Sequence, residues 1–262
     1  MSLKLSAMAV AIAAVTALTG IACASPPTPG VYIALGDSYS AGVGTQENNN
    51  DACQRTPASY PALWELAHSG TRSTSVACTG ATTVDVLDNQ IGAVTSATTL
   101  VTVTVGGDDA GFSDVMTVCV LQGTAACQAA VDQASTFISQ SLPARLADLY
   151  SAIREAAPEA KVVVLGYPRL FESTDPCAGA PDRDSRVALN RGADALDEVT
   201  AAAAARAGFT FADVRDEFAG HGICTTGTPW IQGVVNPLSN SFHPLAAGYA
   251  QGYLPVLTAA AA

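Results

Sequence analysis

Residues 31–40 read VYIALGDSYS: five apolar residues, then a glycine, an aspartate and a serine. The run 31–35 has the continuous apolar pattern of a strand that is buried on both faces. Gly36 lets the chain turn sharply, and Ser38 then stands at the expected start of a helix. Open parallel sheets bind ligands at the carboxyl ends of their strands, so this stretch predicts both the fold class and a place for chemistry.

Four further segments have the composition of strands. They are residues 74–77, 100–105, 162–165 and 209–212. Apolar residues at helical spacing lie between them, at 130–157, where Pro143 breaks or begins a helix, and at 190–207, which ends at Gly208. Alternating strands and helices predict an α/β domain: a flavodoxin-like, three-layer α/β/α sandwich around a parallel, roughly five-stranded sheet. A final helix is expected at 245–257.

The first 24 residues have the features of a secretory signal peptide. Lys4 is the only early charge, an apolar run follows from about residue 7 to 21, and Ala22-Cys23-Ala24 offers an A-x-A cleavage site. We expect cleavage after Ala24, export, and one catalytic domain over residues 25–262. A buried core helix is the structural alternative. A lipoprotein anchor at Cys23 is less favoured, because the usual leucine three residues earlier is missing.

An even set of cysteines remains in residues 25–262. They are Cys53, Cys78, Cys119, Cys127, Cys177 and Cys224. In an exported protein such a set indicates disulfides, and none of them forms a C-x-x-C pair typical of zinc or redox sites. Fifteen connectivities are open. We favour the sequential one, Cys53–Cys78, Cys119–Cys127 and Cys177–Cys224, because Cys119 and Cys127 bracket one short loop. Long loops are expected at 44–60, 112–127 and 220–240.

The charge pattern argues against two kinds of partner. The full chain has a formal net charge of -11, and Lys161 is its only lysine after Lys4. Without a basic patch, neither nucleic acid nor an anionic lipid surface is an expected partner. No later segment is long and apolar enough for stable membrane insertion, and no cofactor or metal is expected.

Polar motifs follow the predicted strands. Ser38 follows the first, Gly80 the second and Gly106–Asp109 the third, while His243 stands in SNSFHP at 239–244. A serine hydroxyl becomes a nucleophile when an adjacent base takes its proton, and glycine lets the backbone approach a ligand closely. Each motif alone also has a structural interpretation: Ser38 as a helix cap, Gly80 as a turn, and His243 as a capping or surface residue.

His243 is the candidate base among three histidines. His68 lies in a helical stretch and is interpreted as structural. His221 lies in a Gly-His-Gly loop that is interpreted as surface.

Together, in this order and spacing, the motifs resemble the GDSL/SGNH hydrolase superfamily. The resemblance covers most of residues 25–262 and is strongest to secreted, disulfide-bearing actinobacterial lipases and esterases, with Gly-Tyr-Pro at 166–168 as a further match. It implies the SGNH hydrolase fold and a serine ester hydrolase that cleaves acyl esters through an acyl-enzyme without a cofactor. We expect a monomer whose partner is a small-molecule or lipid ester.

The resemblance also implies a role for each matched residue. Ser38 would attack the ester carbonyl, and His243 would take its proton and give it to the leaving alcohol. The oxyanion hole would consist of the backbone N–H groups of Ser38 and Gly80 and the side chain at position 108.

Two residues depart from the family pattern. Asp108 stands where the family has an asparagine donor, and an ionised carboxylate only accepts hydrogen bonds. Three alternatives follow: the Asp108 carboxyl is protonated and donates a hydrogen bond, or its side chain points away from the oxyanion, or the enzyme is weak or inactive. Asn240 stands where the family often has an aspartate, so we place Asn240 in the histidine-orienting position and expect a Ser-His dyad. A main-chain carbonyl of 239–241 is the alternative partner of the ring.

Other function classes compete with this interpretation. Asp108 keeps open a catalytically weak or inactive SGNH-fold protein that binds lipid or glycan. Asp37, Asp108 and Asp109 could bind Mg²⁺ at the strand ends, but no phosphate-binding loop accompanies them. The nucleophile elbow G-x-S-x-G is absent, and Gly42-Val43-Gly44 is too short for a dinucleotide fingerprint.

An apolar wall is expected where the acyl group binds. The loops after Gly44 and Phe112 would line it. The side chains expected to form the wall are Phe112, Met116, Val118 and Leu121, with Trp230 and Ile231 bordering the cleft near His243. Ordinary packing is the alternative use of these residues. An apolar wall favours acyl esters of lipids or small alcohols over sugar acetates, while chain length and the choice among lipase, esterase and phospholipase stay open.

Overall fold

A computed structural model describes residues 30–45, 51–173 and 175–262, so the predicted signal peptide and Cys23 lie outside the described residues. Five parallel strands form one sheet in the order β2-β1-β3-β4-β5. They are β1 (Val31–Gly36), β2 (Arg72–Ser75), β3 (Leu100–Thr104), β4 (Lys161–Leu165) and β5 (Thr210–Ala212). This order is that of the flavodoxin-like folds, and the predicted fold class is confirmed.

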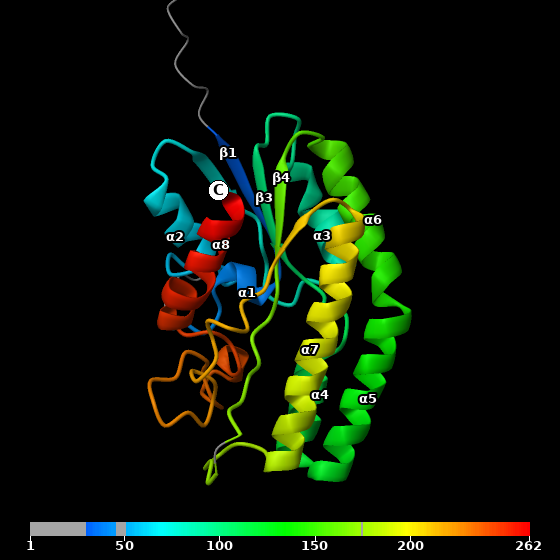
Figure 1. Cartoon of the computed structure of the whole chain (residues 1–262), viewed down its shortest axis with the longest axis vertical. Helices are drawn as coiled ribbons and strands as arrows, with labels where there is room; N and C mark the ends of the chain where they lie inside the picture. Colours follow the sequence, from blue (N-terminus) through cyan, green and yellow to red (C-terminus); the bar gives the residue numbers. More distant parts are fainter. Residues whose placement is uncertain (1–29, 46–50, 174) are drawn as a thin grey trace, which may run out of the picture.

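Helices cover both faces of the sheet and produce the three layers (Figure 1). One face carries α2 (Tyr60–Ala67) and α8 (Leu254–Ala261), and the other carries α3 (Thr83–Asn89), α6 (Leu142–Ala156) and α7 (Arg183–Arg206). Two more helices, α4 (Phe112–Leu121) and α5 (Thr124–Gln140), pack against each other, and α5 packs along α7. A single turn, α1 (Ser38–Ala41), follows β1 directly.

The inner strands form the centre of the core because most of their side chains are apolar, and the buried hydroxyls of Thr102 and Thr104 on β3 are hydrogen-bonded to the hydroxyls of Tyr32 and Tyr60. All five residues of β3 are buried. At the end of β1, Gly36 pairs with Thr104 of β3 and has a φ of 123°, where a Cβ would lie 2.2 Å from the Thr104 carbonyl oxygen. Only glycine fits this close approach, and it lets the chain turn into α1.

The prediction of a loop over 112–127 is wrong, since α4 occupies most of that segment and α5 begins before its end. No side chain caps the start of α4, which follows Gly111, so the usual sequence signal of a helix start is missing. Pro143 lies in the first turn of α6, as expected. The final helix begins at Ala246, close to its predicted start, passes through a π-helical segment, Gly248–Tyr253, and continues as α8 to Ala261, beyond its predicted end.

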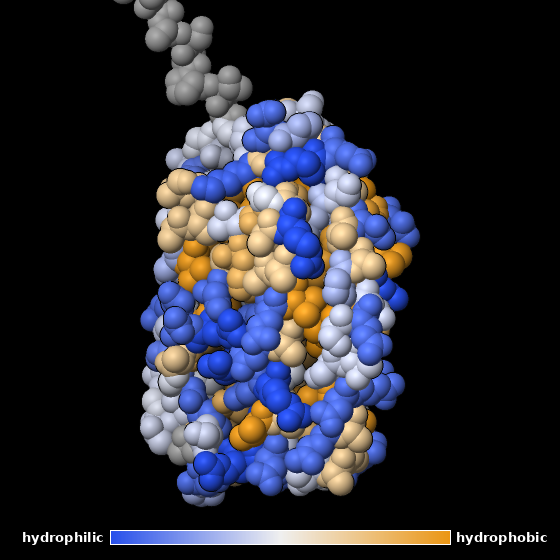
Figure 2. Space-filling view, turned by 45° about the vertical axis from the view of Figure 1, so that its right-hand side comes forward, coloured by the Kyte–Doolittle hydropathy of each residue, from blue (hydrophilic) through white to orange (hydrophobic). Residues whose placement is uncertain are grey.

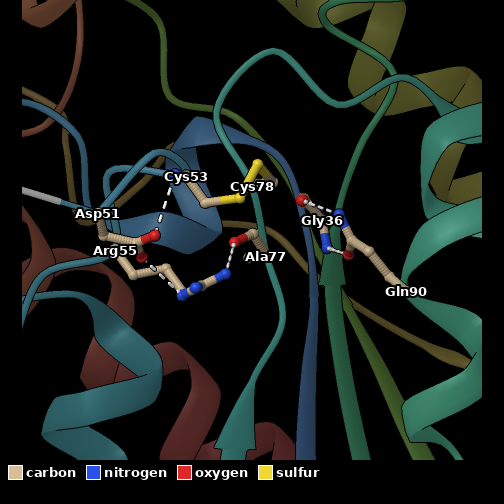
Figure 3. The surroundings of a disulfide bond; sticks show 7 residues. All are labelled: Gly36, Asp51, Cys53, Arg55, Ala77, Cys78 and Gln90. Carbon is tan, nitrogen blue, oxygen red and sulfur yellow. Dashed lines mark hydrogen bonds and ion pairs between the residues drawn. A yellow bond between two sulfur atoms is a disulfide. The ribbon is translucent and has the colours of Figure 1, made fainter.

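Three disulfides join the cysteines in sequential order. The pairs are Cys53–Cys78, Cys119–Cys127 and Cys177–Cys224. The first ties the segment before α2 to the segment after β2 (Figure 3). Close by, the guanidinium of Arg55 pairs with Asp51 at 2.9 Å and donates to the Ala77 carbonyl oxygen at 3.2 Å. These bonds hold the chain just before Gly80.

The face in Figure 2 carries hydrophobic residues in several separate areas among hydrophilic ones. None of the helices in the described part of the chain combines the length and apolar character needed to cross a membrane.

Candidate active site

Ser38 and His243 come from opposite ends of the chain and form one hydrogen bond. Nε2 of His243 lies 2.7 Å from Oγ of Ser38, and Nδ1 lies 2.9 Å from the main-chain oxygen of Ser241. If Nδ1 carries the proton and donates it to that carbonyl, Nε2 is left as an acceptor for the Ser38 hydroxyl proton. This is the geometry that a serine nucleophile and its base require.

The placement of Asn240 in the histidine-orienting position is wrong. Asn240 ends the short helix η2 (Leu238–Asn240), and no hydrogen bond joins it to His243. The ring's partner is instead a backbone group, the carbonyl of Ser241, which lies within the segment named as the alternative. Any residue type at position 241 can supply this carbonyl, so the side-chain pattern does not reveal it.

Burial sets the charge of the candidate base. His243 is 8% exposed. Burial lowers the pKa of His243 to about 4, and the hydrogen bond to the Ser241 carbonyl opposes this shift only in part. The imidazole is therefore neutral above about pH 4, which is the form that can accept a proton from Ser38.

Two residues that the sequence did not single out hold the His243 segment in place. The Tyr39 hydroxyl donates to the Phe242 carbonyl oxygen at 2.7 Å, and Phe242 has a left-handed backbone with φ of 62°. Gly44, with φ of 97°, passes so close that a Cβ would lie 2.8 Å from the His243 Cβ. The left-handed backbone of Phe242 costs about 1–3 kcal/mol and persists because the surrounding structure enforces it.

The Ser38 hydroxyl is free for chemistry because another residue caps α1. Oδ1 of Asp37 accepts the Tyr39 N–H at 2.9 Å, while the backbone N–H of Asp37 donates to the Thr104 carbonyl oxygen at 3.0 Å. The alternative of Ser38 as a cap is wrong, since Asp37 is the N-cap and Ser38 is the first helical residue.

The segments that carry Ser38 and Gly80 are joined at the carboxyl edge of the sheet. The Cys78 N–H donates to the Gly36 carbonyl oxygen at 2.9 Å. Gly80 lies two residues after Cys78, and Ser38 lies two residues after Gly36. The Gln90 side chain fixes Gly36 through both of its backbone groups, at 2.8 and 2.9 Å (Figure 3). Neither the Ser38 N–H nor the Gly80 N–H donates to any residue that the structure describes. Both are available to a ligand.

Asp108 and Asp109 are neighbours with different surroundings. Asp109 accepts from the Thr83 N–H at 2.8 Å, from the Thr83 hydroxyl at 2.7 Å and from Arg145 at 3.1 Å. Asp108 lines the same cavity as Ser38. Burial, followed by the nearby Asp109 and Asp85 carboxylates, raises the pKa of Asp108 to about 6. A carboxyl group with that pKa is a hydrogen-bond donor in mildly acidic solution.

The three aspartates of the magnesium interpretation do not form one cluster. Asp37 accepts from Tyr39 and Tyr167, and Asp109 from Thr83 and Arg145. Within the ranges that the structure describes, no group of three or more metal-ligating side chains occurs.

An apolar cavity opens at Ser38 and runs between α4, α5 and α7. The side chains of its wall include Phe112, Val115, Met116, Val131, Ala134, Ile138, Leu189 and Leu196, with Gly192 and Ala193 on α7. Phe112 and Met116 lie where the sequence placed them, but Val118 and Leu121 do not line the cavity, and Leu121 is 74% exposed. They project elsewhere because the segment is a helix.

Trp230 and Ile231 flank the His243 segment instead of lining that cavity. The Leu245 N–H donates to the Trp230 carbonyl oxygen at 2.7 Å, and Ile231 forms a β-bridge with Pro244.

The other two histidines stack on tryptophans: His68 lies 3.8 Å from Trp64 and His221 lies 3.7 Å from Trp230, measured between ring centroids.

Comparison with known proteins gives concordant results. Residues 34–251 match the GDSL-like Lipase/Acylhydrolase family. "Lipase" of Streptomyces rimosus is 50% identical over 231 residues, 87% of this chain and 86% of the relative. "Lipase 1" of Streptomyces coelicolor is 45% identical over 257 residues, 95% of each chain.

Two solved structures have the same fold at high identity. The extracellular lipase from Streptomyces rimosus has a TM-score of 0.86 at 50% identity, over 88% of this chain and 99% of that one. Phospholipase A1 from Streptomyces albidoflavus NA297 also has a TM-score of 0.86, at 46% identity and the same coverage.

Proposed function

The chain belongs to the GDSL-like lipase/acylhydrolase family, and we propose that it is a secreted carboxylic ester hydrolase with Ser38 as nucleophile and His243 as general base. The observation that carries the proposal is the 2.7 Å hydrogen bond between these side chains at the mouth of an apolar cavity. Residues 1–24 would be the signal peptide and 25–262 the catalytic domain. The extracellular relative supports export.

In the acylation step, Oγ of Ser38 attacks the carbonyl carbon of the ester while Nε2 of His243 takes the hydroxyl proton. The resulting tetrahedral oxyanion accepts hydrogen bonds from the N–H groups of Ser38 and Gly80 and from the protonated carboxyl of Asp108. His243 then gives the proton to the leaving alcohol oxygen as the ester bond breaks, and the acyl group stays on Ser38.

Deacylation repeats these steps with water as the nucleophile. His243 takes a proton from water, the hydroxide attacks the acyl-enzyme carbonyl, and the same three donors hold the oxyanion. The proton returns to Ser38 Oγ as the carboxylic acid leaves. The Ser241 carbonyl supports the positively charged ring by accepting its Nδ1–H at 2.9 Å, which is the role that a carboxylate has in a triad.

The cavity walls favour an acyl chain over a polar group. Its lining from α4, α5 and α7 is aliphatic and aromatic, and each methylene removed from water contributes about 0.8 kcal/mol. The natural substrate would then be a lipid ester or an ester of a small alcohol. The lipase and phospholipase relatives support this substrate class.

A leucine at position 192 should shorten the acyl chain that the enzyme accepts. Gly192 lines the cavity from α7, and a Cβ there would make only one contact within 4 Å, 3.4 Å from Val131. The remaining Leu atoms would occupy space that three or four methylenes use. We expect kcat/KM for octanoyl and longer p-nitrophenyl esters to fall about 10- to 100-fold, with acetyl and butyryl esters nearly unchanged.

Gly192→Ala is the matched control, because one added carbon leaves most of the cavity open. An unchanged chain-length profile in Gly192→Leu would show that acyl groups bind elsewhere.

Asn240→Ala should leave catalysis within about twofold of the parent, because the Ser241 carbonyl orients His243 without it. The measurement is kcat and KM for p-nitrophenyl butyrate. Asn240→Asp serves as the companion variant. A loss of about a hundredfold in Asn240→Ala would mean that the side chain orients the ring in the working enzyme.

The proposed function itself is tested by hydrolysis and by covalent labelling. The purified mature protein should hydrolyse p-nitrophenyl esters, and an active-site serine phosphonate should label Ser38 alone, as located by peptide mass spectrometry. Labelling that fails, together with no hydrolysis of short or long acyl esters, would favour the inactive lipid- or glycan-binding protein.

A further inference from the structure

The mechanism gives no role to the Gly-Tyr-Pro stretch at 166–168, yet Tyr167 lies between the two turns that carry it. The Tyr167 hydroxyl donates to Oδ2 of Asp37, and the same oxygen accepts the Gly107 N–H at 3.2 Å. Asp37 directly precedes Ser38, and Gly107 directly precedes Asp108. One buried hydroxyl therefore joins the turn of the nucleophile to the turn of the unusual oxyanion donor.

We propose that Tyr167 is a positioning residue for ester hydrolysis, which fixes these two turns relative to each other. The inference rests on the proposed function.

Tyr167 is itself held from several sides. Its backbone N–H donates to Oδ1 of buried Asp197 at 2.8 Å, and the Tyr253 hydroxyl donates to the Gly166 carbonyl oxygen at 2.9 Å. Its ring meets Tyr39 edge to face, with centroids 5.0 Å apart. The hydroxyl thus has one well-defined position from which to hold both turns.

The two carboxyl groups differ in their hydrogen bonds. Asp37 accepts from the Tyr167 hydroxyl and from the N–H groups of Tyr39 and Ser40. No donor from the described ranges reaches the carboxyl of Asp108. Burial and the nearby Asp108 carboxylate raise the pKa of Asp37, and the hydrogen bonds that it accepts oppose this shift.

The two carboxyl groups also differ in their charged neighbours. Asp108 faces the carboxylates of Asp109 and Asp85, which favour its neutral form, and Arg145 is already paired with Asp109. Asp37 faces only tyrosine hydroxyls besides Asp108. Burial and Asp37 raise the pKa of Tyr167, so the hydroxyl stays protonated and remains a donor across the working pH range.

The test is Tyr167→Phe, measured as kcat and KM against pH alone and in the Asp108→Asn background. Misplaced turns should lower kcat at least about tenfold with KM within about twofold of the parent. The fall in kcat should persist across the pH range and should remain in the Asp108→Asn background.

Tyr32→Phe is the matched control, because it removes one buried hydroxyl, hydrogen-bonded to Thr102 at 2.8 Å, near the opposite end of β1. A Tyr167→Phe enzyme with the kcat of Tyr32→Phe would overturn the inference. Assay of the parent separates this failure from failure of the proposed function. An active parent with an unaffected variant would contradict only the role of Tyr167. An inactive parent would contradict both the role of Tyr167 and the proposed function.

Discussion

Ser38→Ala will reduce kcat for p-nitrophenyl ester hydrolysis by at least about 10⁵-fold, with little change in KM for whatever activity remains. This hydroxyl is the group with which His243 Nε2 forms a hydrogen bond in the described part of the chain, at 2.7 Å, so the proposed acyl-enzyme cannot form without it. The folded protein should survive, because Asp37, and not Ser38, caps α1. Turnover is measured at pH 5.5 with butyryl and octanoyl esters.

Further variants can show whether Ser38 and His243 act together in catalysis. His243→Ala should lose nearly as much activity as Ser38→Ala, and the double variant should lose little more, because the two side chains act as a unit. Ser151→Ala, an exposed serine hydroxyl on α6, is the matched control with parental activity. Residual hydrolysis in Ser38→Ala at a few per cent of the parent would mean that another group is the nucleophile.

The sheet could be predicted because its signals are local. Continuous apolar runs such as 31–35 and 100–105 mark buried strands wherever they lie in space, and all five strands appear within a few residues of their predicted positions. The helix α4 was missed for a physical reason. It starts after a glycine without a side-chain cap, and its stability comes from packing on α5, which no local pattern reveals.

The residues of the candidate site likewise fall into those that the sequence reveals and those that it does not. Ser38, Gly80 and Asp108 could be located because each follows a strand that the sequence shows. The groups that hold them could not: the contact of Gly44 with His243, and the hydrogen bonds of Tyr39 and Tyr167, join segments about 130 to 200 residues apart. The Ser241 carbonyl is a backbone group and leaves no mark in the sequence.

Asp108 makes the pH profile of this enzyme a prediction in its own right. The proposed mechanism requires a neutral His243, whose pKa is about 4, and a protonated Asp108, whose pKa is about 6. We expect a bell-shaped dependence of kcat/KM with its maximum between about pH 4 and 6. Above the upper limb Asp108 carries a negative charge beside the developing oxyanion and can no longer donate to it.

Asp108→Asn should remove the upper limb. The amide donates at every pH, so the ratio of variant to parental kcat should be near one at pH 5 and rise to about 100-fold at pH 8, where about 1% of a carboxyl group with a pKa of about 6 is still protonated. Asp114→Asn, an exposed carboxylate in the first turn of α4, should leave the profile unchanged.

The pH dependence of thermal stability provides a second measurement of the protonation of Asp108. The pKa of Asp108 is raised on folding, from 3.8 to about 6, so its favourable contribution is fully present below about pH 4 and is lost as the pH rises to about 6. Asp108→Asn lacks this titration, so the Tm of the variant should rise relative to that of the parent between about pH 4 and 6. A ratio of rates that is flat with pH, together with a Tm difference that does not move, would mean that Asp108 points away from the oxyanion. The backbone N–H groups of Ser38 and Gly80 would then have to hold the oxyanion without it.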